Sequence, residues 1–445
     1  MNQPSKWTQT TLGEALPIRY GKARTDKAGV VREETAVYGS SGVIDKFDRA
    51  LTSGPTLIIG RKGTVGATHY SSEACWPIDT VYFAEASDDK DLRFFKYLLD
   101  HLQLARMDRS TAVPGLSRDD YNAKEVAIPD IDEQQRIVSE IEKQFTRLDA
   151  GVTSLKRAQT ALKRYRASVL KAACEGRLVP TEADLARKEN RSYESADVLC
   201  ARILKERREN WKGKSNYKEP LSPNAVDLPS LPEGWAWATV EQLAAPEPNS
   251  ITDGPFGSNL KTEHYTNSGP RVIRLQNIGD GVFVDEEAHI SGTHFVRLQK
   301  HRVFTGDLVI AAFGENPPRA CIIPPALGPA IVKADCIRFK PHRDVAAKYM
   351  NAALNSDPIR RRTKAMVHGV GRPRLNLGEI KSIVLPVPPR AEQHRVAGET
   401  EQRLSVIDEL GSVISTEFQR AIRLRQSILR RAFDDEFSTS SLTEA

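Results

Sequence analysis

The sequence predicts an α+β protein built as a tandem repeat, in which two mixed α/β domains are each followed by a long helix. A helical motif occurs twice at one constant offset, short β-rich runs precede each copy, and a proline-rich stretch separates the first helix from the second domain. We expect the two helices to form an antiparallel coiled coil with pseudo-twofold symmetry. The predicted parts are a first globular domain at 1–130, a central helical region and linker at 131–232, a second globular domain at 233–388, and a distal helix with a tail at 389–445.

The repeat is clearest where the segment IPDIDEQQRIV returns as VPPRAEQHRVA. Glu133 matches Glu392, which gives an offset of 259 (392 minus 133), and the later segments YRASVLKAA and LRQSILRRA match at the same offset. The domain starts follow another offset, since Trp7 matches Trp235 at an offset of 228 (235 minus 7). The larger offset at the helices means that the second copy gained an insertion between its start and its helix. The helices have stayed alike while the globular domains diverged.

Strand signals in both globular domains are short and β-rich, and Gly, Asn and Asp residues separate them. In the first domain the clearest run is residues 55–59. In the second domain we expect strands within residues 271–275, 307–312 and 331–339. These runs indicate two mixed α/β domains.

Both repeated segments predict long helices. From Ile137 onward, apolar residues recur mostly at steps of three and four, which is the stripe of a coiled coil. Prolines stand just before each helix start. A helix of about 40 residues would be about 60 Å long. The residues expected in the stripe, for the coiled coil and for partner docking, are Ile137, Ile141, Leu148, Leu155, Leu162, Val169, Val396, Leu404, Ile407, Ile414, Leu424 and Ile428.

The distribution of charge predicts that the two helices pair antiparallel. Each helix begins with glutamates, and between Asp149 and Glu175 every charged residue is basic, an arrangement that the second copy repeats. Antiparallel pairing lays each acidic start against the basic end of the other helix, whereas parallel pairing stacks like charges. For any single basic residue, a solvated helical face is an equally good interpretation.

The interval from residue 180 to about 232 is polar, with a short helix expected at residues 195–211. It ends in KEPLSPNAVDLPSLPEGW, whose regularly spaced prolines indicate a linker and a domain boundary.

The bulk composition limits the possible functions. The formal net charge of +6 permits a polyanionic partner without requiring one. The five cysteines form no CxxC pair and no Cys/His cluster at zinc spacing, so we expect unpaired thiols and no metal site. The longest apolar run, residues 308–313, is far shorter than the ~20 residues of a membrane-spanning helix. We expect a soluble, cytoplasmic protein with no membrane partner.

No motif predicts catalysis by this chain. The segment GRKGTVG follows an expected strand but lacks the GxxxxGK[ST] order and a following helical pattern. The segment NPPR resembles the Asn-Pro-Pro-aromatic loop of N6-adenine methyltransferases, yet Arg319 stands where a stacking aromatic is needed. No FxGxG-type cofactor strand precedes it. We therefore expect no catalytic residue and no cofactor on this chain.

Two basic segments instead predict contact with a polyanion. A Gly-rich turn presents Arg61 and Lys62, which suits a phosphate backbone, and a purely structural turn is the alternative. Residues 360–374 carry six basic residues and no acid. Such a glycine-bearing basic loop can follow a phosphate backbone while its arginines reach guanine edges, and a solvated surface is the alternative. The matching stretch before the first helix is thinner and includes Arg109 and Arg118.

Together these motifs resemble the specificity subunit of type I restriction–modification systems, over nearly the whole chain from Trp7 to about Phe437. In the first copy the resemblance depends on YGSSGVID, TLIIGRKGTVG and WPIDT. In the second copy it depends on TDGPFGSNLKTEHYT, RVIRLQNIGDGVF and GDLVIAAFG. The paired EQQR and EQHR helix starts and LKRYRASVLKAACEGRL complete it.

In that family the two globular parts are target recognition domains, each of which reads one half of a split double-stranded DNA sequence. The resemblance implies that the helices set the half-site spacing and dock two methyltransferase subunits, and that restriction subunits join for cleavage. S-adenosylmethionine is then expected on the partner methyltransferase. Two divergent domains agree with two different half-sites, and two alike helices agree with pseudo-twofold docking of identical partners.

We therefore expect a non-enzymatic DNA-recognition subunit that acts within a methyltransferase complex. One alternative is a coiled-coil scaffold joining two protein-binding domains, which predicts no salt-sensitive DNA binding. The DGPFGS segment can be a structural turn as readily as a reading loop. The resemblance and the basic segments give as candidate DNA-binding residues Tyr38, Ser40, Ser41, Arg61, Lys62, Arg109, Arg118, Ser258, Lys261, Arg274, Gln276, Asn277, Arg360, Arg361, Arg362, Lys364, Arg372 and Arg374.

Overall fold

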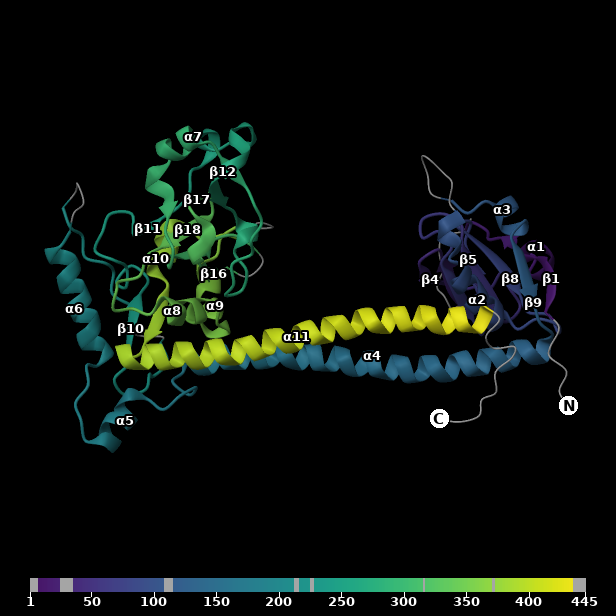
Figure 1. Ribbon diagram of the computed structural model, residues 1–445, viewed down its shortest axis with the longest axis horizontal. Coiled ribbons are helices and arrows are strands. Elements are labelled where there is room, and N and C mark those ends of the chain that lie inside the picture. The colour runs from purple at the N-terminus through teal and green to yellow at the C-terminus, as the bar shows by residue number, and fades with distance from the viewer. Residues whose placement is uncertain are drawn as a thin grey trace. The chain divides into compact units, whose positions relative to one another are not determined.

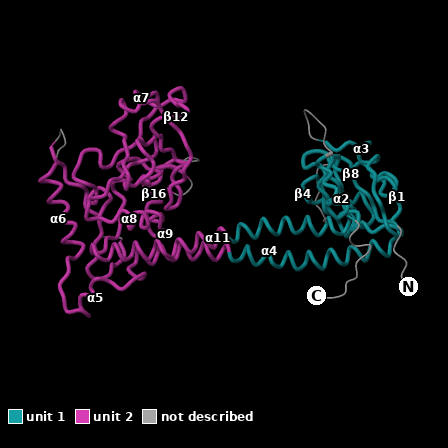
Figure 2. Tube along the Cα trace, viewed as in Figure 1, with its two compact units in different colours: residues 1–158, 413–445 teal, residues 159–412 magenta. Residues whose placement is uncertain are grey.

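The computed structural model describes residues 7–24, 35–107, 115–211, 216–224, 228–314, 317–369 and 373–434. The chain divides into two compact units: residues 1–158 with 413–445 form unit 1, and residues 159–412 form unit 2 (Figure 2). Each unit therefore contains one globular domain and part of both long helices. The four consecutive parts predicted from the sequence stay a prediction, because each unit combines separate stretches of the chain. Among the described helices, none is long and apolar enough to cross a membrane.

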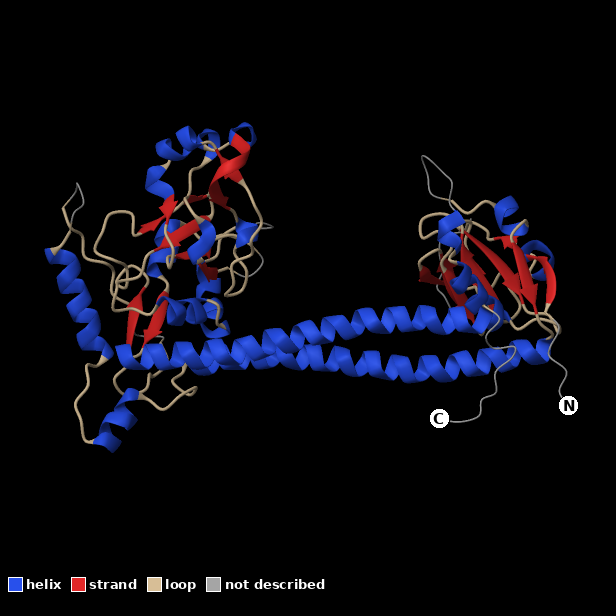
Figure 3. Cartoon of the chain, in the orientation of Figure 1, coloured by secondary structure: helices blue, strands red, loops and turns tan. Residues whose placement is uncertain are grey.

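The globular domain of unit 1 combines a four-stranded sheet, β2-β8-β5-β6, with a three-stranded sheet, β4-β3-β7 (Figure 3). β5 is the run TLIIG that the sequence predicted as a strand, and burial of all its residues explains why it is continuously apolar. The elements before the long helix are β1 (Thr8–Thr11), α1 (Leu12–Ala15), β2 (Arg19–Tyr20), β3 (Thr35–Gly39), β4 (Gly42–Phe47), β5 (Thr56–Gly60), β6 (Thr68–Ser71), β7 (Trp76–Pro77), β8 (Val81–Glu85), α2 (Leu92–Leu102), α3 (Arg118–Asn122) and β9 (Glu125–Ile128).

The globular domain of unit 2 contains two four-stranded sheets, β11-β18-β15-β16 and β13-β12-β17-β14. Its expected strands are present, and the run at 331–339 divides into β17 and β18 at Asp335, whose φ of 65° turns the chain. The elements are β10 (Ala236–Thr239), β11 (Ile251–Thr252), β12 (Tyr265–Ile273), β13 (His289–Ile290), α7 (Gly292–Arg297), β14 (Arg302–Val303), β15 (Leu308–Ala311), β16 (Arg319–Ile322), β17 (Ala330–Val332), β18 (Cys336–Phe339), α8 (Ala347–Leu354), α9 (Asp357–Thr363), α10 (Leu377–Ser382) and β19 (Val384–Val387).

An equivalent two-stranded ribbon joins the first and last strand of each globular domain. β1 pairs antiparallel with β9, with Thr8 opposite Ile128, and β10 pairs with β19, with Ala236 opposite Val387. The first strands of the two ribbons differ by the offset of the domain starts, 228 (236 minus 8). The last strands differ by the offset of the helices, 259 (387 minus 128). The insertion in the second copy therefore lies between two strands that are hydrogen-bonded neighbours. The domain could grow at that point without displacing its helix.

The long helices are α4 (Ile131–Cys174) and α11 (Arg390–Phe433), each of 44 residues (Figure 1). The helices are slightly longer than the sequence predicted. Asp130 begins α4, because its carboxylate accepts the backbone N–H of Glu133 (2.9 Å). The α+β class and the two long helices are confirmed.

The antiparallel pairing is confirmed by one ion pair in each unit. In unit 1, Nη1 of Arg425 lies 3.1 Å from Oδ1 of Asp149, and in unit 2, Nη1 of Arg166 lies 2.8 Å from Oδ1 of Asp408. The advance along α4 from 149 to 166 equals the return along α11 from 425 to 408. At the offset of the repeat, the two pairs are equivalents of each other. The acidic partners are these aspartates within the helices rather than the glutamates at the helix starts.

The ends of the predicted apolar stripe pack against the globular domains. Ile137, Ile141 and Ile428 belong to the core of unit 1, while Val169 and Val396 belong to the core of unit 2. The long helices are therefore part of each domain core as well as of the coiled coil. Nearer the middle of the helices, Ile407 and Ile414 are buried, and Leu148, Leu155, Leu162 and Leu404 are half-buried.

Leu424 departs from the predicted stripe, because it is 48% exposed, and its repeat equivalent Tyr165 is 46% exposed. Arg425, the next residue of α11, is partly buried instead of Leu424. Its Cζ lies 3.9 Å from the centroid of the Phe145 ring. An arginine stem can pack like an apolar side chain while its guanidinium reaches an acid. Apolar periodicity does not reveal this substitution.

Two helices, α5 (Glu182–Glu189) and α6 (Ala196–Glu209), lie in the segment before the linker. The predicted helix at 195–211 is α6. The sequence analysis missed α5, whose residues are mainly polar and carry little apolar periodicity. Its start is nevertheless specified by Thr181, whose hydroxyl accepts the backbone N–H of Asp184 (3.1 Å).

Candidate nucleic-acid interface

The YGSSG and GRKG segments, which are far apart in the sequence, are neighbours in unit 1. The hydroxyl of Ser40 accepts the backbone N–H of Thr64 (3.3 Å), and the Ser40 carbonyl lies 3.1 Å from Nε2 of His69. Gly60 permits this approach of the two turns, since a Cβ there would lie 2.1 Å from the Thr64 carbonyl oxygen. Two hairpins thus form one surface from two of the predicted reading segments.

The GRKG turn is held by its backbone, which leaves its basic side chains available. The backbone N–H groups of Arg61 and Lys62 both donate to the Thr80 carbonyl (3.0 and 3.1 Å). A phosphate-binding loop joins a strand to a helix, whereas this turn joins the strands β5 and β6. This agrees with the missing helical pattern after the GRKG segment. The side chains of Lys62 and Ser41 are exposed, and Tyr38 is half-buried.

Tyr20 brings two of the predicted basic residues together. Cζ of Arg61 lies 5.4 Å from the centroid of the Tyr20 ring, and Cζ of Arg118 lies 5.5 Å from the same centroid. Nη2 of Arg61 donates to the Asp79 carbonyl (2.8 Å), and Nη2 of Arg118 donates to the Ile18 carbonyl (3.1 Å). Among the described residues, neither guanidinium has a carboxylate partner. We call Tyr20, Ser41, Arg61, Lys62 and Arg118 the basic surface of unit 1.

Sequence reasoning missed Tyr20 and His69, and it placed Arg109 where the structure gives no description. Tyr20 is 49% exposed, and its role follows from cation–π contacts with two arginines that are distant in the sequence. No motif or spacing connects these positions in the sequence. An isolated tyrosine in the two-residue strand β2 gave no signal that could have identified it.

In unit 2, the DGPFGS segment forms a loop that is fixed at both ends. Gly254 packs so closely that a Cβ would lie 2.0 Å from the backbone carbon of Lys333, and Leu260 is buried in a local core. Between these anchors Phe256 is 45% exposed, and Ser258 is also exposed, as is Lys261 just beyond Leu260. The loop therefore combines a structural turn with exposed side chains, and the two interpretations of the sequence do not exclude each other.

The LQNIGDG segment of unit 2 divides into structural and exposed residues. Asn277 is fully buried: its Oδ1 accepts the Arg274 backbone N–H (2.8 Å), and its amide donates to two backbone carbonyls. It has the geometry of a structural residue, so we do not include it in the proposed interface. Arg274 is half-buried, and its Nη2 lies 3.3 Å from the Glu287 carbonyl oxygen. Gln276 is exposed.

Comparisons with known proteins add independent information about this chain. Residues 4–160 match the family model described as the type I restriction modification DNA specificity domain. The EcoDI specificity subunit of Escherichia coli is 23% identical over 449 residues, which cover 98% of this chain and 89% of that protein. The EcoBI specificity subunit of Escherichia coli is 23% identical over 387 residues, covering 86% and 73%. The chain is therefore similar, over nearly its whole length, to type I specificity subunits.

A solved structure shares the fold of this chain. It is described as showing complex assembly and conformational transition of the type I R-M system, and one of its chains has a TM-score of 0.59 to this one. The sequence identity is 14%, and the alignment covers 97% of this subunit and 98% of that chain. The likeness therefore shows a shared fold.

In the basic segment 360–374, two of the basic side chains are paired with acids. Arg360 binds Asp280 (2.6 Å) and donates to the Pro318 carbonyl, and Arg374 binds Asp335 (2.6 Å). Arg372 lies outside the described residues. The remaining three basic residues are Arg361 and Lys364, which are exposed, and Arg362, which is half-buried against Trp237.

The EQQR and EQHR motifs attach each long helix to its globular domain. Oε1 of Gln134 accepts the backbone N–H of Asp91 (3.0 Å), and its Nε2 donates to the Pro129 carbonyl (3.0 Å). Gln393 makes the equivalent bonds, with Ala346 N–H (2.8 Å) and the Pro388 carbonyl (3.0 Å). Asp91 and Ala346 are the N-cap residues of α2 and α8. We call each set of two bonds the glutamine clasp.

In unit 1, apolar side chains of the long helices line a groove. The groove has a volume of about 900 Å³ and runs between α4 and α11. Four of the predicted docking residues line it: Leu148, Leu155, Leu424 and Ile428. Exposure of Leu424 thus places an apolar side chain at this groove.

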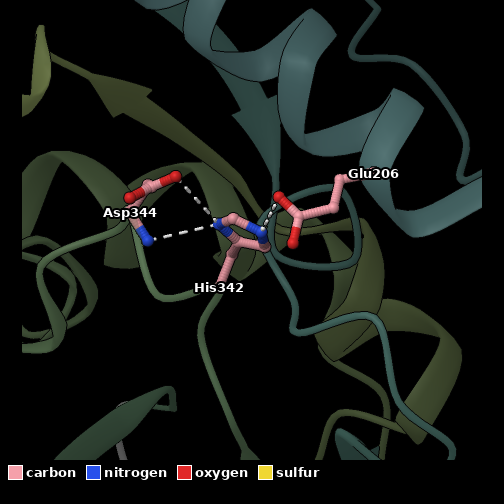
Figure 4. A group of neighbouring side chains, drawn as sticks. All are labelled: Glu206, His342 and Asp344. Carbon is pink, nitrogen blue, oxygen red and sulfur yellow. Dashed lines mark hydrogen bonds and ion pairs between the residues drawn. The ribbon is translucent and has the colours of Figure 1, made fainter. Parts of the chain in front are cut away.

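One histidine and two acids of unit 2 lie close enough together to resemble a metal site. His342 lies between Glu206 and Asp344, with Nε2 3.3 Å from Oε2 of Glu206 (Figure 4). Nδ1 already accepts the backbone N–H of Asp344 (3.2 Å), and the two carboxylates bind Arg202, Arg343 and Arg390. Three guanidinium groups around two carboxylates disfavour a divalent cation. The group instead joins α6 to the segment before α8 and to the start of α11.

Proposed function

We propose that this specificity subunit reads a bipartite DNA sequence, with the basic surface of unit 1 on one half-site and the exposed residues of unit 2 on the other. One observation carries the proposal. The GRKG turn and α3 bring Lys62, Arg61 and Arg118 to one surface, and the described residues provide no carboxylate for any of the three. Unpaired cations on a backbone-fixed turn suit phosphates and guanine edges.

Similarity to the type I specificity subunits supports the broader function. In this proposal the chain recognises DNA, works with methyltransferase partners and is not itself an enzyme. We further propose that two methyltransferase subunits dock on the repeated helices, that they bind S-adenosylmethionine, and that restriction subunits join for cleavage. The repeat supports this stoichiometry, because equivalent surfaces bind equivalent partners. In this proposal the complex acts on genomic DNA in the cytoplasm.

The decisive experiment is to map methylated adenines in host DNA by single-molecule sequencing, with and without the subunit. We expect a split motif that disappears when the subunit is absent. In a second arm, the purified complex with its methyltransferase and S-adenosylmethionine should protect that motif. If no bipartite site were methylated or protected, and DNA binding showed no salt dependence, the scaffold alternative would replace the proposal.

A further inference from the structure

A cavity of about 370 Å³ in unit 2 combines basic residues with an aromatic wall. It lies between the end of α4, the segment 229–232, β10 and α9. Its lining includes the charged residues Lys171, Glu175, Arg177 and Arg362, together with Trp237 and the prolines at 229, 232 and 358.

Arg362 lacks the carboxylate partner that two buried arginines of unit 2 have. Arg338 binds Asp307 (2.6 Å) and Arg271 binds Asp285 (2.5 Å). Within the described part of the chain, Arg362 has neither an acidic partner nor a hydrogen-bond acceptor, and its Nε is buried. Its Cζ lies 4.5 Å from the centroid of the Trp237 ring. A half-buried guanidinium without a counter-ion destabilises the free protein, and a bound anion would relieve that cost.

The other charges leave the cavity positive. Glu175 is the single acid of its lining, and it is shared between Lys171, whose Nζ is 3.9 Å away, and Arg177. Three basic residues thus face one acid. Burial also lowers the pKa of Arg362, which indicates that its charge is poorly solvated in the free subunit. A guanidinium held over an indole ring can bind an oxyanion through two N–H groups.

We propose that this cavity binds a phosphate group of the DNA backbone, with Arg362 as the main ligand and with Lys171 and Arg177 as supporting charges. The inference rests on the proposed function and deepens it. These residues would fix the position of the subunit on DNA without reading bases.

The neighbouring charges favour DNA over an acidic peptide. Arg361 and Lys364 are exposed beside Arg362, and among the described residues neither has an acidic partner. They extend the positive charge beyond the cavity along α9 and the turn that follows. A succession of unpaired cations suits the regularly spaced phosphates of a duplex, whereas a single carboxylate would need only one cation.

The first test measures anion binding by thermal unfolding of the full-length subunit in its methyltransferase complex. Inorganic phosphate should raise the unfolding temperature more than sodium chloride of equal ionic strength does. The variant Arg362→Met should lose this phosphate-specific rise. Without phosphate it should unfold at the same or a higher temperature, because an uncompensated charge is gone. Arg187→Gln is the matched control, since Arg187 is exposed and already paired with Asp184 and Glu233.

The second test measures affinity for a duplex containing the methylated motif, at roughly 50 to 200 mM salt. Arg362→Met should make the slope of log affinity against log salt shallower by about 0.9, the contribution of one phosphate contact. The methylated motif should stay unchanged, and Arg187→Gln should leave the slope unaltered. Arg362→Lys should retain the slope because it retains the charge.

Each result separates this inference from the proposed function. An unchanged slope for Arg362→Met, in a complex that still methylates a bipartite site, would overturn the inference alone. A phosphate effect on unfolding with an unchanged slope would assign the cavity to an acidic protein segment and overturn the DNA assignment. A lower unfolding temperature for Arg362→Met without phosphate, with no phosphate effect in the parent complex, would make Arg362 a structural residue.

Discussion

On the basic surface of unit 1, each guanidinium group is held by a backbone carbonyl and by the ring of Tyr20. Arg61 and Arg118 keep further N–H donors for a partner, because each uses one Nη2 to reach a carbonyl. Beneath them, burial raises the pKa of Tyr82 to about 12, so its hydroxyl stays protonated and donates to the Leu116 carbonyl (3.0 Å). Guanidinium groups fixed in this way lose less entropy on binding than free ones.

We predict that Tyr20 is a positioning residue for the first half-site. Tyr20→Leu removes two cation–π contacts, each worth about 0.5–1 kcal/mol at an exposed position, so affinity should fall roughly 5- to 30-fold. Tyr20→Phe keeps the ring and should bind within about twofold of the parent. Titrations with duplexes mutated in one half-site at a time give the measurement. Equal losses for Leu and Phe, or no loss for Leu, would contradict a positioning role.

His342 should make the stability of unit 2 depend on pH. Burial lowers the pKa of His342 despite the opposing effect of Glu206 and Asp344, so the folded state holds the neutral ring. In the unfolded chain the pKa is about 6.5, so the contribution of His342 is fully present above that pH. It is lost as pH falls below about 6.5 through the folded pKa.

The measurement is the unfolding temperature of the parent and of His342→Gln across that pH range. The parent should lose stability faster than the variant as the solution becomes acidic. His394→Gln, at an exposed position of α11, is the control and should follow the parent. If the parent and His342→Gln showed the same pH dependence, the ring would not be held neutral by burial.

Sequence motifs suggested candidate site residues only where the chemistry is local. Ser40, Arg61 and Lys62 belong to short segments whose turn composition predicts presentation at a surface. Tyr20 contributes through rings and cations brought together by the fold, which no spacing encodes. Arg360 shows that a basic segment can also mislead. It lies among other basic residues, yet its guanidinium binds Asp280, which is distant in the sequence. Counting charges along the chain cannot separate paired from unpaired cations.

At the scale of elements, the glutamine clasp explains why the EQQR and EQHR motifs recur. Gln134 is 2% exposed and Gln393 is fully buried, so both amides are withdrawn from water. Each accepts from the N-cap residue of a domain helix and donates to a proline carbonyl five positions earlier. Proline suits that place because only its carbonyl is needed there. The clasp therefore fixes a domain helix to the start of a long helix.

We predict that breaking one clasp weakens recognition of one half-site. Gln134→Leu leaves the Asp91 N–H and the Pro129 carbonyl without partners, which costs roughly 1–3 kcal/mol for each group that stays buried. The unfolding temperature should fall and binding to the first half-site should weaken, while Gln393→Leu should affect the second. Gln135→Leu is the control, because its side chain is exposed on the same helical turn. Equal effects of Gln134→Leu and Gln135→Leu would remove the clasp from this role.

Long helices were the most predictable elements, since an apolar stripe repeated over many turns leaves little choice of structure. The stripe did not reveal that Arg166 and Arg425 replace Tyr165 and Leu424 at the helix interface. Nor did it reveal α5, which is held by tertiary contacts: Glu182 binds Arg191 and Arg395, and its backbone N–H donates to Glu392 (2.8 Å). Elements stabilised by distant partners carry little local signal.

For the whole molecule, duplication separates parts that can change from parts that cannot. Each globular domain returns to its own starting strand through β9 or β19, so insertions between the paired strands leave the helix start in place. The helices kept one offset, and the equivalent pairs Asp149–Arg425 and Arg166–Asp408 fix one antiparallel register. Recognition can therefore diverge in each domain while the surfaces offered to partners stay alike.

This register gives the test of whether helix length sets the half-site spacing. Seven residues inserted after Val152 of α4, together with seven after Ile422 of α11, add about two turns to both helices at facing positions, because 149 pairs with 425. Both ion pairs can then still form. We expect a folded complex whose methylated motif has a longer spacer, or one that no longer methylates because the half-sites fall out of phase.

The same insertion in α4 alone is the matched control. It lies between Asp149 and Arg166, so the two ion pairs cannot form together and the unfolding temperature should fall. The motif in host DNA is read by single-molecule sequencing in each strain. A folded double-insertion complex that methylated the original motif at the original spacing would show that the distance between half-sites is set elsewhere. A longer spacer would identify the two long helices as the element that measures it.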